Sequence, residues 1–209
     1  MIIKVCGMRE SENIREVEAL GIDLMGFIFW PKSSRYVSER PSYLPTKCKR
    51  VGVFVDANID EILRIADEYA LDIIQLHGHE NPKHCILIRD QVSPEVKIIK
   101  AFNIATADDL AQTAAFSGLV DYFLFDTKGK SIGGNGEQFD WTVLSAYDDS
   151  TQFLLSGGIG PNDAGRLRAL LVLNGFPVEK CIGIDLNSRF EVEPAYKDIK
   201  KLKTFLEQL

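Results

Sequence analysis

The stretch Gln152-Phe-Leu-Leu-Ser-Gly-Gly-Ile-Gly-Pro-Asn-Asp163 is typical of a strand, a glycine loop and the start of a helix. The apolar run Phe153 to Leu155 is too short for a helix, and the Pro-Asn pair favours a helix start. Gly157 and Gly158 leave backbone N–H groups unobstructed by side chains. Such amides beside a helix N-terminus favour a phosphate dianion, although a tight strand-to-helix turn without a ligand has the same pattern.

A second stretch near the C-terminus has the same character. Cys181-Ile-Gly-Ile-Asp185 is a short apolar strand, and the turn residues Asn187 and Ser188 follow it. In (β/α)8 barrels the loops after strands seven and eight frequently form a phosphate site. The two stretches together therefore predict phosphate binding at adjacent strand ends.

Strand and helix patterns alternate along the whole chain, and its 209 residues give about 26 residues for each of eight units. Short connections and the lack of a linker predict one α/β domain over residues 1–209, a single (β/α)8 TIM barrel. A doubly wound open sheet is the alternative, but Cys6-Gly7-Met8-Arg9 does not supply the G-x-G-x-x-G that it needs. We expect strands at 2–6, 24–29, 50–55, 71–76, 96–102, 122–126, 153–155 and 181–185. We expect helices at 11–20 with Ser11 as N-cap, and at 38–44, 59–69, 82–89, 105–116, 141–147, 164–172 and 197–208.

Composition excludes several classes of partner. The net charge is −6 and there is no basic run, which argues against nucleic acid, so local groups must attract an anionic substrate. No apolar run approaches the roughly 18 residues of a membrane span. The N-terminus lacks the layout of a signal peptide, so we expect a cytoplasmic protein with no membrane partner.

The cysteines predict neither disulfides nor a metal site. They stand at 6, 48, 85 and 181, scattered and without zinc-type spacing, and we expect reduced thiols. The densest possible cluster is His77, His79, His84 and Cys85, but no carboxylate stands at a matching spacing. We therefore predict no metal.

Polar residues at the C-terminal ends of strands are the candidates for chemistry, because barrel enzymes place their active sites there. Alternation along 122–126 puts the two phenylalanines on one face and Asp126 on the other, which turns Asp126 inward. Each candidate also has a structural alternative, such as a small core residue, a cap or a solvated charge. The candidates are Cys6, Arg35, Gln75, His77, Asp126 and Asp185.

Short motifs run in order from the first strand to the eighth: Lys4-Val-Cys-Gly-Met8, Gly26-Phe-Ile-Phe29, Ser34-Arg-Tyr36, Val51-Gly-Val-Phe-Val55, Gln75-Leu-His-Gly78, Asp126, Gly133-Gly-Asn-Gly136 with Phe139-Asp-Trp141, Leu155-Ser-Gly-Gly158 and Gly183-Ile-Asp-Leu-Asn-Ser188. Together they resemble the phosphoribosylanthranilate isomerase family. The resemblance implies an Amadori rearrangement of N-(5-phosphoribosyl)anthranilate in tryptophan biosynthesis, with a phosphosugar as partner and no cofactor. It leaves open whether the chain is a monomer or a homodimer.

The resemblance also implies a role for each candidate residue. Cys6 would be the general base, Asp126 the general acid, and Arg35 would meet the anthranilate carboxylate. Gln75 and His77 would contact the substrate, while Gly157, Gly158 and the turn formed by Asp185, Asn187 and Ser188 would hold the phosphate. One departure is Arg189, which stands where glycine is more usual and which we expect to face solvent.

The chemistry accounts for these residue types. Ring opening needs a proton on the furanose oxygen, which a carboxylic acid kept protonated beside an anionic substrate can deliver. The resulting iminium acidifies the C2′ proton, which a thiolate can remove. We therefore predict either a locally depressed Cys6 pKa or deprotonation of Cys6 on substrate binding.

Other functions fit these residues less well. An imidazole-pathway ribonucleotide isomerase would be expected to have aspartate in place of Cys6, and indole-glycerol-phosphate synthase would need a lysine-rich catalytic set. A catalytically silent phosphate-binding barrel would not explain why both the acid position and the base position are intact. A thiol redox protein would need a resolving cysteine near Cys6.

Overall fold

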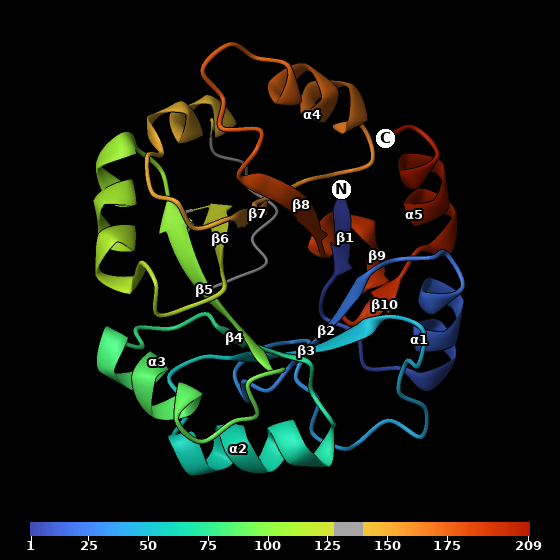
Figure 1. The fold of residues 1–209 in the computed structure, drawn as a ribbon. Helices are drawn as coiled ribbons and strands as arrows, with labels where there is room; N and C mark the ends of the chain where they lie inside the picture. The colour runs from blue at the N-terminus through green and yellow to red at the C-terminus, as the bar shows by residue number, and fades with distance from the viewer. Residues whose placement is uncertain (128–139) are drawn as a thin grey trace.

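Eight parallel strands close into a barrel in chain order, and β8 pairs back to β1 (Figure 1). The computed structural model describes residues 1–127 and 140–209, so the predicted Gly133–Gly136 motif and Phe139 lie outside the described residues. The predicted TIM barrel is confirmed. The strands are β1 Ile2–Val5, β2 Leu24–Ile28, β3 Lys49–Phe54, β4 Ile73–Leu76, β5 Lys97–Ile104, β6 Tyr122–Thr127, β7 Phe153–Leu155 and β8 Cys181–Leu186.

Alternation along the strands separates two apolar layers. Side chains such as Val53, Leu124 and Leu154 fill the barrel interior, whereas Phe123 and Phe125 pack outward against the surrounding helical layer. The inward face of β6 therefore includes Asp126, as the period of two predicts.

Helices surround the barrel and begin at side-chain caps where the sequence provides them. The side chains of Asn58, Asn81 and Asp198 each accept a hydrogen bond from an amide in the first turn of their helix. The α-helices are α1 Ser11–Glu18, α2 Ile59–Glu68, α3 Pro82–Arg89, α4 Ala164–Leu171 and α5 Ile199–Leu206; the 3-10 helices are η1 Ala107–Phe116, η2 Trp141–Ala146 and η3 Ser188–Phe190.

The predicted helix at 38–44 is wrong. The chain between β2 and β3 runs outside the barrel without a helix (Figure 1), because Pro41 lacks an amide and disfavours helical backbone in the residue before it. Glu18 fixes this segment instead, since its carboxylate accepts hydrogen bonds from the Thr46 and Lys47 amides, both at 2.5 Å. The predicted N-cap is also displaced by one residue: Glu10 is the N-cap of α1, and Ser11 is the first helical residue.

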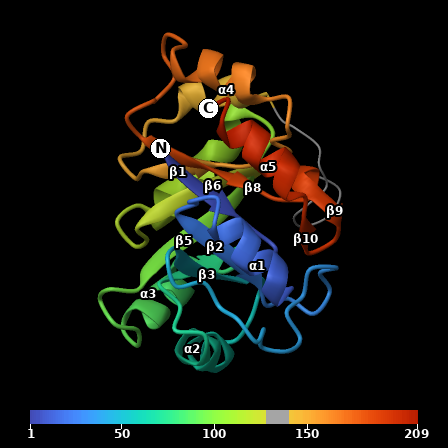
Figure 2. The same ribbon diagram turned by 90° about the vertical axis from the view of Figure 1, so that its right-hand side faces the viewer.

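A short antiparallel hairpin between β8 and α5 was not predicted. It consists of β9 Glu191–Glu193 and β10 Tyr196–Lys197, with Lys197 opposite Glu191. The Asn13 side chain of α1 fixes it by accepting from the Lys197 amide at 2.7 Å and donating to the Lys197 carbonyl at 3.0 Å. Figure 2 shows α1 and α5 side by side, with β9 and β10 to the right of them. The last helix consequently begins at Ile199 rather than at Lys197.

Candidate functional site

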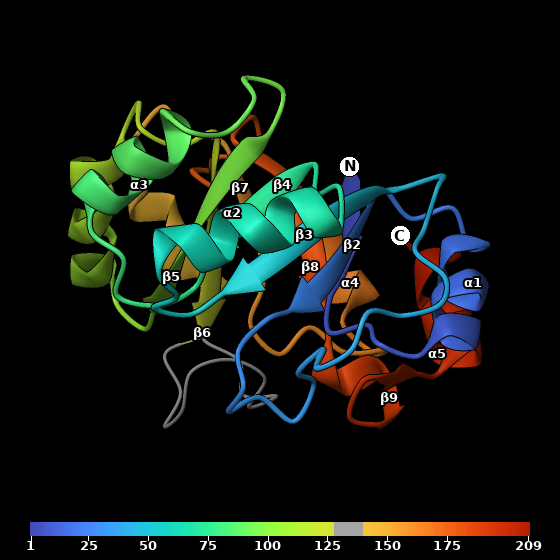
Figure 3. The ribbon, with the colours of Figure 1, turned by 90° about the horizontal axis from the view of Figure 1, so that it is seen from below.

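The C-terminal ends of the strands form one end of the barrel, which we call the mouth. Figure 3 shows the N-terminus at the upper side and β9 at the lower side, so the mouth faces down in that view. Cys6 directly follows β1, His77 directly follows β4, and Asp126 and Asp185 lie near the ends of β6 and β8. The fold therefore brings these four predicted residues to the same end.

Cys6 lies inside the barrel beside a buried ion pair. Its exposed fraction is 4%, and the Lys4 ammonium donates to Asp185 Oδ1 at 2.9 Å. Burial raises the pKa of the Cys6 thiol, although Lys4 and Lys197 act in the opposite direction. The predicted local depression of the Cys6 pKa is therefore wrong for the ligand-free protein, and deprotonation on substrate binding is the alternative that remains.

The ion pair itself is enclosed in the same interior. Burial raises the pKa of Asp185 although Lys4 lowers it, and the charge of Asp126 adds to the rise. The Lys4 pKa is also raised, because Asp185 and Cys6 together outweigh the effect of burial. The Asp185 carboxylate is thus engaged with Lys4 inside the barrel, and its Oδ2 accepts from the Ser156 hydroxyl in the loop after β7 at 3.5 Å.

Asp126 faces an imidazole across the mouth. Its Oδ1 accepts from the Thr127 amide at 2.8 Å, and its Oδ2 lies 3.4 Å from His77 Nε2 without hydrogen-bond geometry. Gln75 Nε2 lies 3.4 Å from His77 Nδ1. Among the described residues, no partner satisfies the buried atoms Gln75 Oε1 and His77 Nε2. Buried polar atoms without partners are costly, and a bound ligand can satisfy them.

Arg35 is held by a residue that the sequence did not suggest. Its Nε and Nη2 donate to Glu191 Oε1 at 2.8 Å and Oε2 at 2.6 Å. Although burial opposes it, this bidentate contact raises the pKa of Arg35 and keeps the guanidinium charged. Lys197 Nζ also donates to Glu191 Oε1, at 2.6 Å. The alternating Glu-Val-Glu of β9 is the only sequence signal for this hairpin, and it is too short to be decisive.

The loops that follow β7 and β8 lie next to each other because β7 pairs with β8. Gly157 and Gly158 have φ values of 87° and 65°, a left-handed conformation that suits glycine. Asn187 Oδ1 accepts from Lys197 Nζ at 2.8 Å, and Ser188 begins η3. Arg189 is exposed, as expected. Consecutive backbone amides in such a conformation can form an anion-binding concavity.

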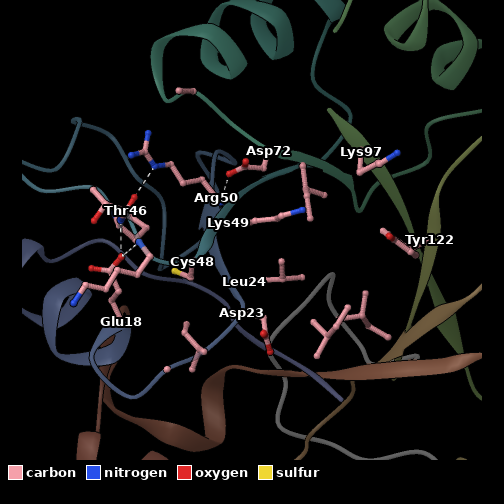
Figure 4. A pocket seen from close by; sticks show the side chains of 18 of the residues that line it. Glu18, Asp23, Leu24, Thr46, Cys48, Lys49, Arg50, Asp72, Lys97 and Tyr122 are labelled. Carbon is pink, nitrogen blue, oxygen red and sulfur yellow. Dashed lines mark hydrogen bonds between the residues drawn. The ribbon is translucent and has the colours of Figure 1, made fainter. Parts of the chain in front are cut away.

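A cavity of about 910 Å³ opens at the opposite end of the barrel (Figure 4). Asp23, Lys49, Asp72 and Lys97 contribute to its lining, and none of the predicted site residues does. Residues at the N-terminal ends of the strands line this cavity, and barrel enzymes do not place their active sites at that end. Its size alone therefore does not make it the active site.

Among residues 1–127 and 140–209, no group of three or more His, Cys, Asp or Glu side chains could hold a metal ion. None of the helices described for these ranges is long and apolar enough to span a membrane.

Comparisons with known proteins agree with one another. The family model described as N-(5'phosphoribosyl)anthranilate (PRA) isomerase matches residues 3–208. The chain is 50% identical over 209 residues to the N-(5'-phosphoribosyl)anthranilate isomerase of Phocaeicola vulgatus, covering 100% of this chain and 98% of that relative. The crystal structure of the Thermotoga maritima enzyme matches with a TM-score of 0.81 at 30% identity, covering 100% of this chain and 98% of that one. A structure of such an isomerase in complex with reduced 1-(o-carboxyphenylamino)-1-deoxyribulose 5-phosphate has a TM-score of 0.77 at 27% identity, covering 100% of this chain and 98% of that one.

Proposed function

The chain belongs to the N-(5'-phosphoribosyl)anthranilate isomerase family, and we propose that it performs this isomerisation with Cys6 as general base and Asp126 as general acid. The observation that supports these roles best is their joint placement at the barrel mouth, with Cys6 after β1 and Asp126 turned inward on β6. The product is the 1-(o-carboxyphenylamino)-1-deoxyribulose 5-phosphate skeleton, and the step belongs to tryptophan biosynthesis.

Ring opening is the task of Asp126. The carboxylic acid gives its proton to the furanose oxygen while the C1′–O bond breaks, and the anthranilate nitrogen supplies the electron pair that forms the iminium. The Thr127 amide bonded to Asp126 Oδ1 orients the carboxyl, which leaves Oδ2 for the proton. His77 lies 3.4 Å from Oδ2 and is placed to hold the carboxylate that remains.

Proton removal from C2′ is the task of Cys6. The iminium makes this proton acidic, and its electrons form the C1′–C2′ double bond of an enolamine, which tautomerises to the ketone. The thiol must first ionise, and burial opposes that in the ligand-free protein. The positive iminium adds to the charges of Lys4 and Lys197, so ionisation becomes favourable when substrate occupies the site.

Contacts to the two ends of the substrate, its carboxylate and its phosphate, bind and orient it. Arg35 offers a charged planar fork that suits the anthranilate carboxylate. The left-handed Gly157–Gly158 loop and the neighbouring Asp185–Ser188 turn suit the phosphate through their backbone amides. Gln75 and His77 hold buried polar atoms ready for the hydroxyls between these ends. Together they fix the reacting carbon between acid and base.

The experiment follows the fluorescence of anthranilate derivatives after purified protein is added to freshly formed N-(5'-phosphoribosyl)anthranilate. We expect rapid conversion without release of free anthranilate by the wild type. Cys6→Ala should lose about 100 to 10,000-fold in turnover, whereas the matched thiol control Cys48→Ala should retain it. Near-normal turnover of Cys6→Ala would remove the thiol from the mechanism, and no conversion by wild type would leave a phosphate-binding barrel with another substrate.

A further inference from the structure

An ionic cluster at the mouth contains two residues, Glu191 and Lys197, to which the mechanism above gives no contact with the substrate. It consists of Arg35, Glu191 and Lys197, whose side chains are 12%, 6% and 0% exposed. Glu191 lies between the two cations and accepts from both, at 2.6 to 2.8 Å. With one carboxylate and two cations, the cluster has a net charge of +1 when all three are ionised.

Holding these charges in the interior is costly. Burial lowers the pKa of Lys197 although Glu191 raises it, so the ammonium is less stable here than in water. Glu191 moves the other way: despite burial, the bonds from Arg35 and Lys197 lower its pKa and keep it charged. Apolar residues of similar size often stabilise a protein as well as a buried ionic cluster does, so stability alone is a weak reason for this arrangement.

The cluster lies against the residue that follows the proposed base. A Cβ added at Gly7 would lie 2.6 Å from Arg35 Cδ and 2.8 Å from Asn187 Oδ1. Asn187 in turn accepts from Lys197. The charged groups that act on the Cys6 thiol are Lys4 and Asp185 from the barrel interior and Lys197 and Arg35 from this cluster. Glu191 and Lys197 therefore surround the side chain proposed to bind the carboxylate, and the charges of Lys197 and Arg35 act on the Cys6 thiol.

The guanidinium geometry indicates what Glu191 does. Its bonds use Nε and Nη2, which form one edge of the fork, and leave the Nη1 edge unused by Glu191. A carboxylate that approaches Arg35 would meet an already neutralised ion pair if Glu191 had no second cation. Lys197 supplies that cation, so the pair Glu191–Lys197 orients Arg35 without cancelling its charge.

We propose that Lys197 and Glu191 are positioning residues of the isomerase: Glu191 aims Arg35 at the substrate carboxylate, and Lys197 balances Glu191 so that the Arg35 charge stays available to the substrate and to the Cys6 thiolate. This inference rests on the proposed roles of Arg35 and Cys6. It assigns to the β9–β10 hairpin a part in substrate recognition.

The first test separates KM from phosphate binding. Lys197→Met should raise KM for N-(5'-phosphoribosyl)anthranilate about 10-fold, roughly 1.4 kcal/mol. Inhibition by ribose 5-phosphate, which lacks the carboxylate, should change much less, because Lys197 contacts the Asn187 side chain and the turn suits the phosphate through its backbone amides. Lys197→Arg should restore most of the loss. The matched control is Lys201→Met, which removes a half-exposed lysine of α5 and should change neither constant.

A double variant keeps the proposal falsifiable if the single variant is unstable. Glu191→Gln combined with Lys197→Met removes both balancing charges but keeps an acceptor for Arg35, so its KM should be lower than that of Lys197→Met alone. If Lys197 and Glu191 were merely structural, KM of the double variant would be as high as that of Lys197→Met or higher. Parallel rises in KM and in the ribose 5-phosphate inhibition constant would also overturn the proposal.

The second test needs no turnover and so distinguishes failure of this inference from failure of the proposed function. Thiolate absorbance near 240 nm is titrated in the ligand-free protein, and the signal of the Cys6→Ala variant is subtracted. Lys197→Met should move ionisation of Cys6 to higher pH, while Lys201→Met should leave it in place. An unmoved titration with intact wild-type activity would refute the electrostatic part of the inference alone.

Discussion

The two ends of the barrel are both rich in charged side chains, yet they use them differently. At the N-terminal end, Asp23 and Asp72 are exposed and accept hydrogen bonds from the Ile3 and Arg50 amides at 2.7 and 2.8 Å. At the mouth, by contrast, the charged groups are buried and face one another, as in the pair of Lys4 with Asp185.

Burial also acts differently on Asp121 at the N-terminal end than on Asp185 and Cys6 in the barrel interior. Despite partial burial, the Ile98 amide and Arg89 lower the pKa of Asp121 at the N-terminal end. At the mouth, burial raises the pKa of Asp185 and of the Cys6 thiol. Carboxylates at the N-terminal end therefore complete the hydrogen bonding of the strands, whereas in the barrel interior burial penalises the charged forms of Asp185 and Cys6. Such perturbed groups gather at functional sites.

The largest effect expected from this comparison is on turnover. Asp126→Asn keeps an oxygen for the Thr127 amide but cannot donate the proton, so turnover should fall about 100 to 10,000-fold. The isosteric change Asp72→Asn at the other end also keeps its acceptor and should leave turnover within about twofold of wild type. Steady-state assays of both variants test this, and equal losses would show that the two ends do not differ.

The next effect is on stability, and it compares two lysines. Lys4→Met leaves Asp185 buried without its partner and should lower the free energy of unfolding by about 3–5 kcal/mol. Lys97→Met at the N-terminal end removes a partly exposed ion pair with Asp121 and should cost no more than about 1 kcal/mol. Urea unfolding measures both.

A second variant tells whether the unpaired charge causes the loss. Lys4→Met combined with Asp185→Leu removes both members of the pair and should recover most of the lost stability, while turnover stays low. A double variant as unstable as the single one would attribute the loss to packing around Lys4 instead.

The barrel could be predicted from sequence because its signals are local. Short apolar runs between helical patterns predicted every strand to within a few residues, and period-two alternation along 122–126 placed Asp126 inward correctly. The helix expected at 38–44 failed because the apolar spacing there was weaker than the effect of Pro41 and the tertiary contacts of Glu18.

The site was predictable only in part, since position in a strand does not reveal partners. The strand-end positions of Cys6 and Asp126 were predicted from sequence and are seen in the structure, while their catalytic roles stay predictions. Glu191 and Lys197 were missed because their contact with Arg35 spans 156 residues of sequence and depends on a hairpin of a few residues. The sequence likewise left open whether the Cys6 pKa is depressed before substrate binds, because burial depends on the closed barrel and not on neighbouring residues.

Two glycines with the same backbone conformation sharpen the comparison further. Gly7 at the mouth and Gly21 at the N-terminal end both have φ of 77°. An added Cβ at Gly7 would displace Arg35, whereas at Gly21 it would meet no atom within 4 Å. Both alanine variants should lose about 1–2 kcal/mol of stability to backbone strain. Only Gly7→Ala should also raise KM, by about 10-fold if one charge-assisted hydrogen bond weakens; an equal rise in Gly21→Ala would contradict this.

The smallest expected effect is on the pH dependence of thiol labelling, and it should be the same for two thiols at opposite ends of the barrel. Burial raises the Cys6 pKa above its ordinary value of 9.0, so the neutral thiol predominates at pH 7 and the reactive thiolate grows about tenfold per pH unit. Iodoacetamide labelling of ligand-free Cys6, followed by mass spectrometry, should therefore accelerate from pH 7 to 9 without a plateau. Cys48 at the N-terminal end, where burial raises the pKa to about 12, should behave in the same way. A plateau for Cys6 near pH 8 would mean that its pKa is depressed before substrate binds, and the mouth would then activate its base without help from the iminium.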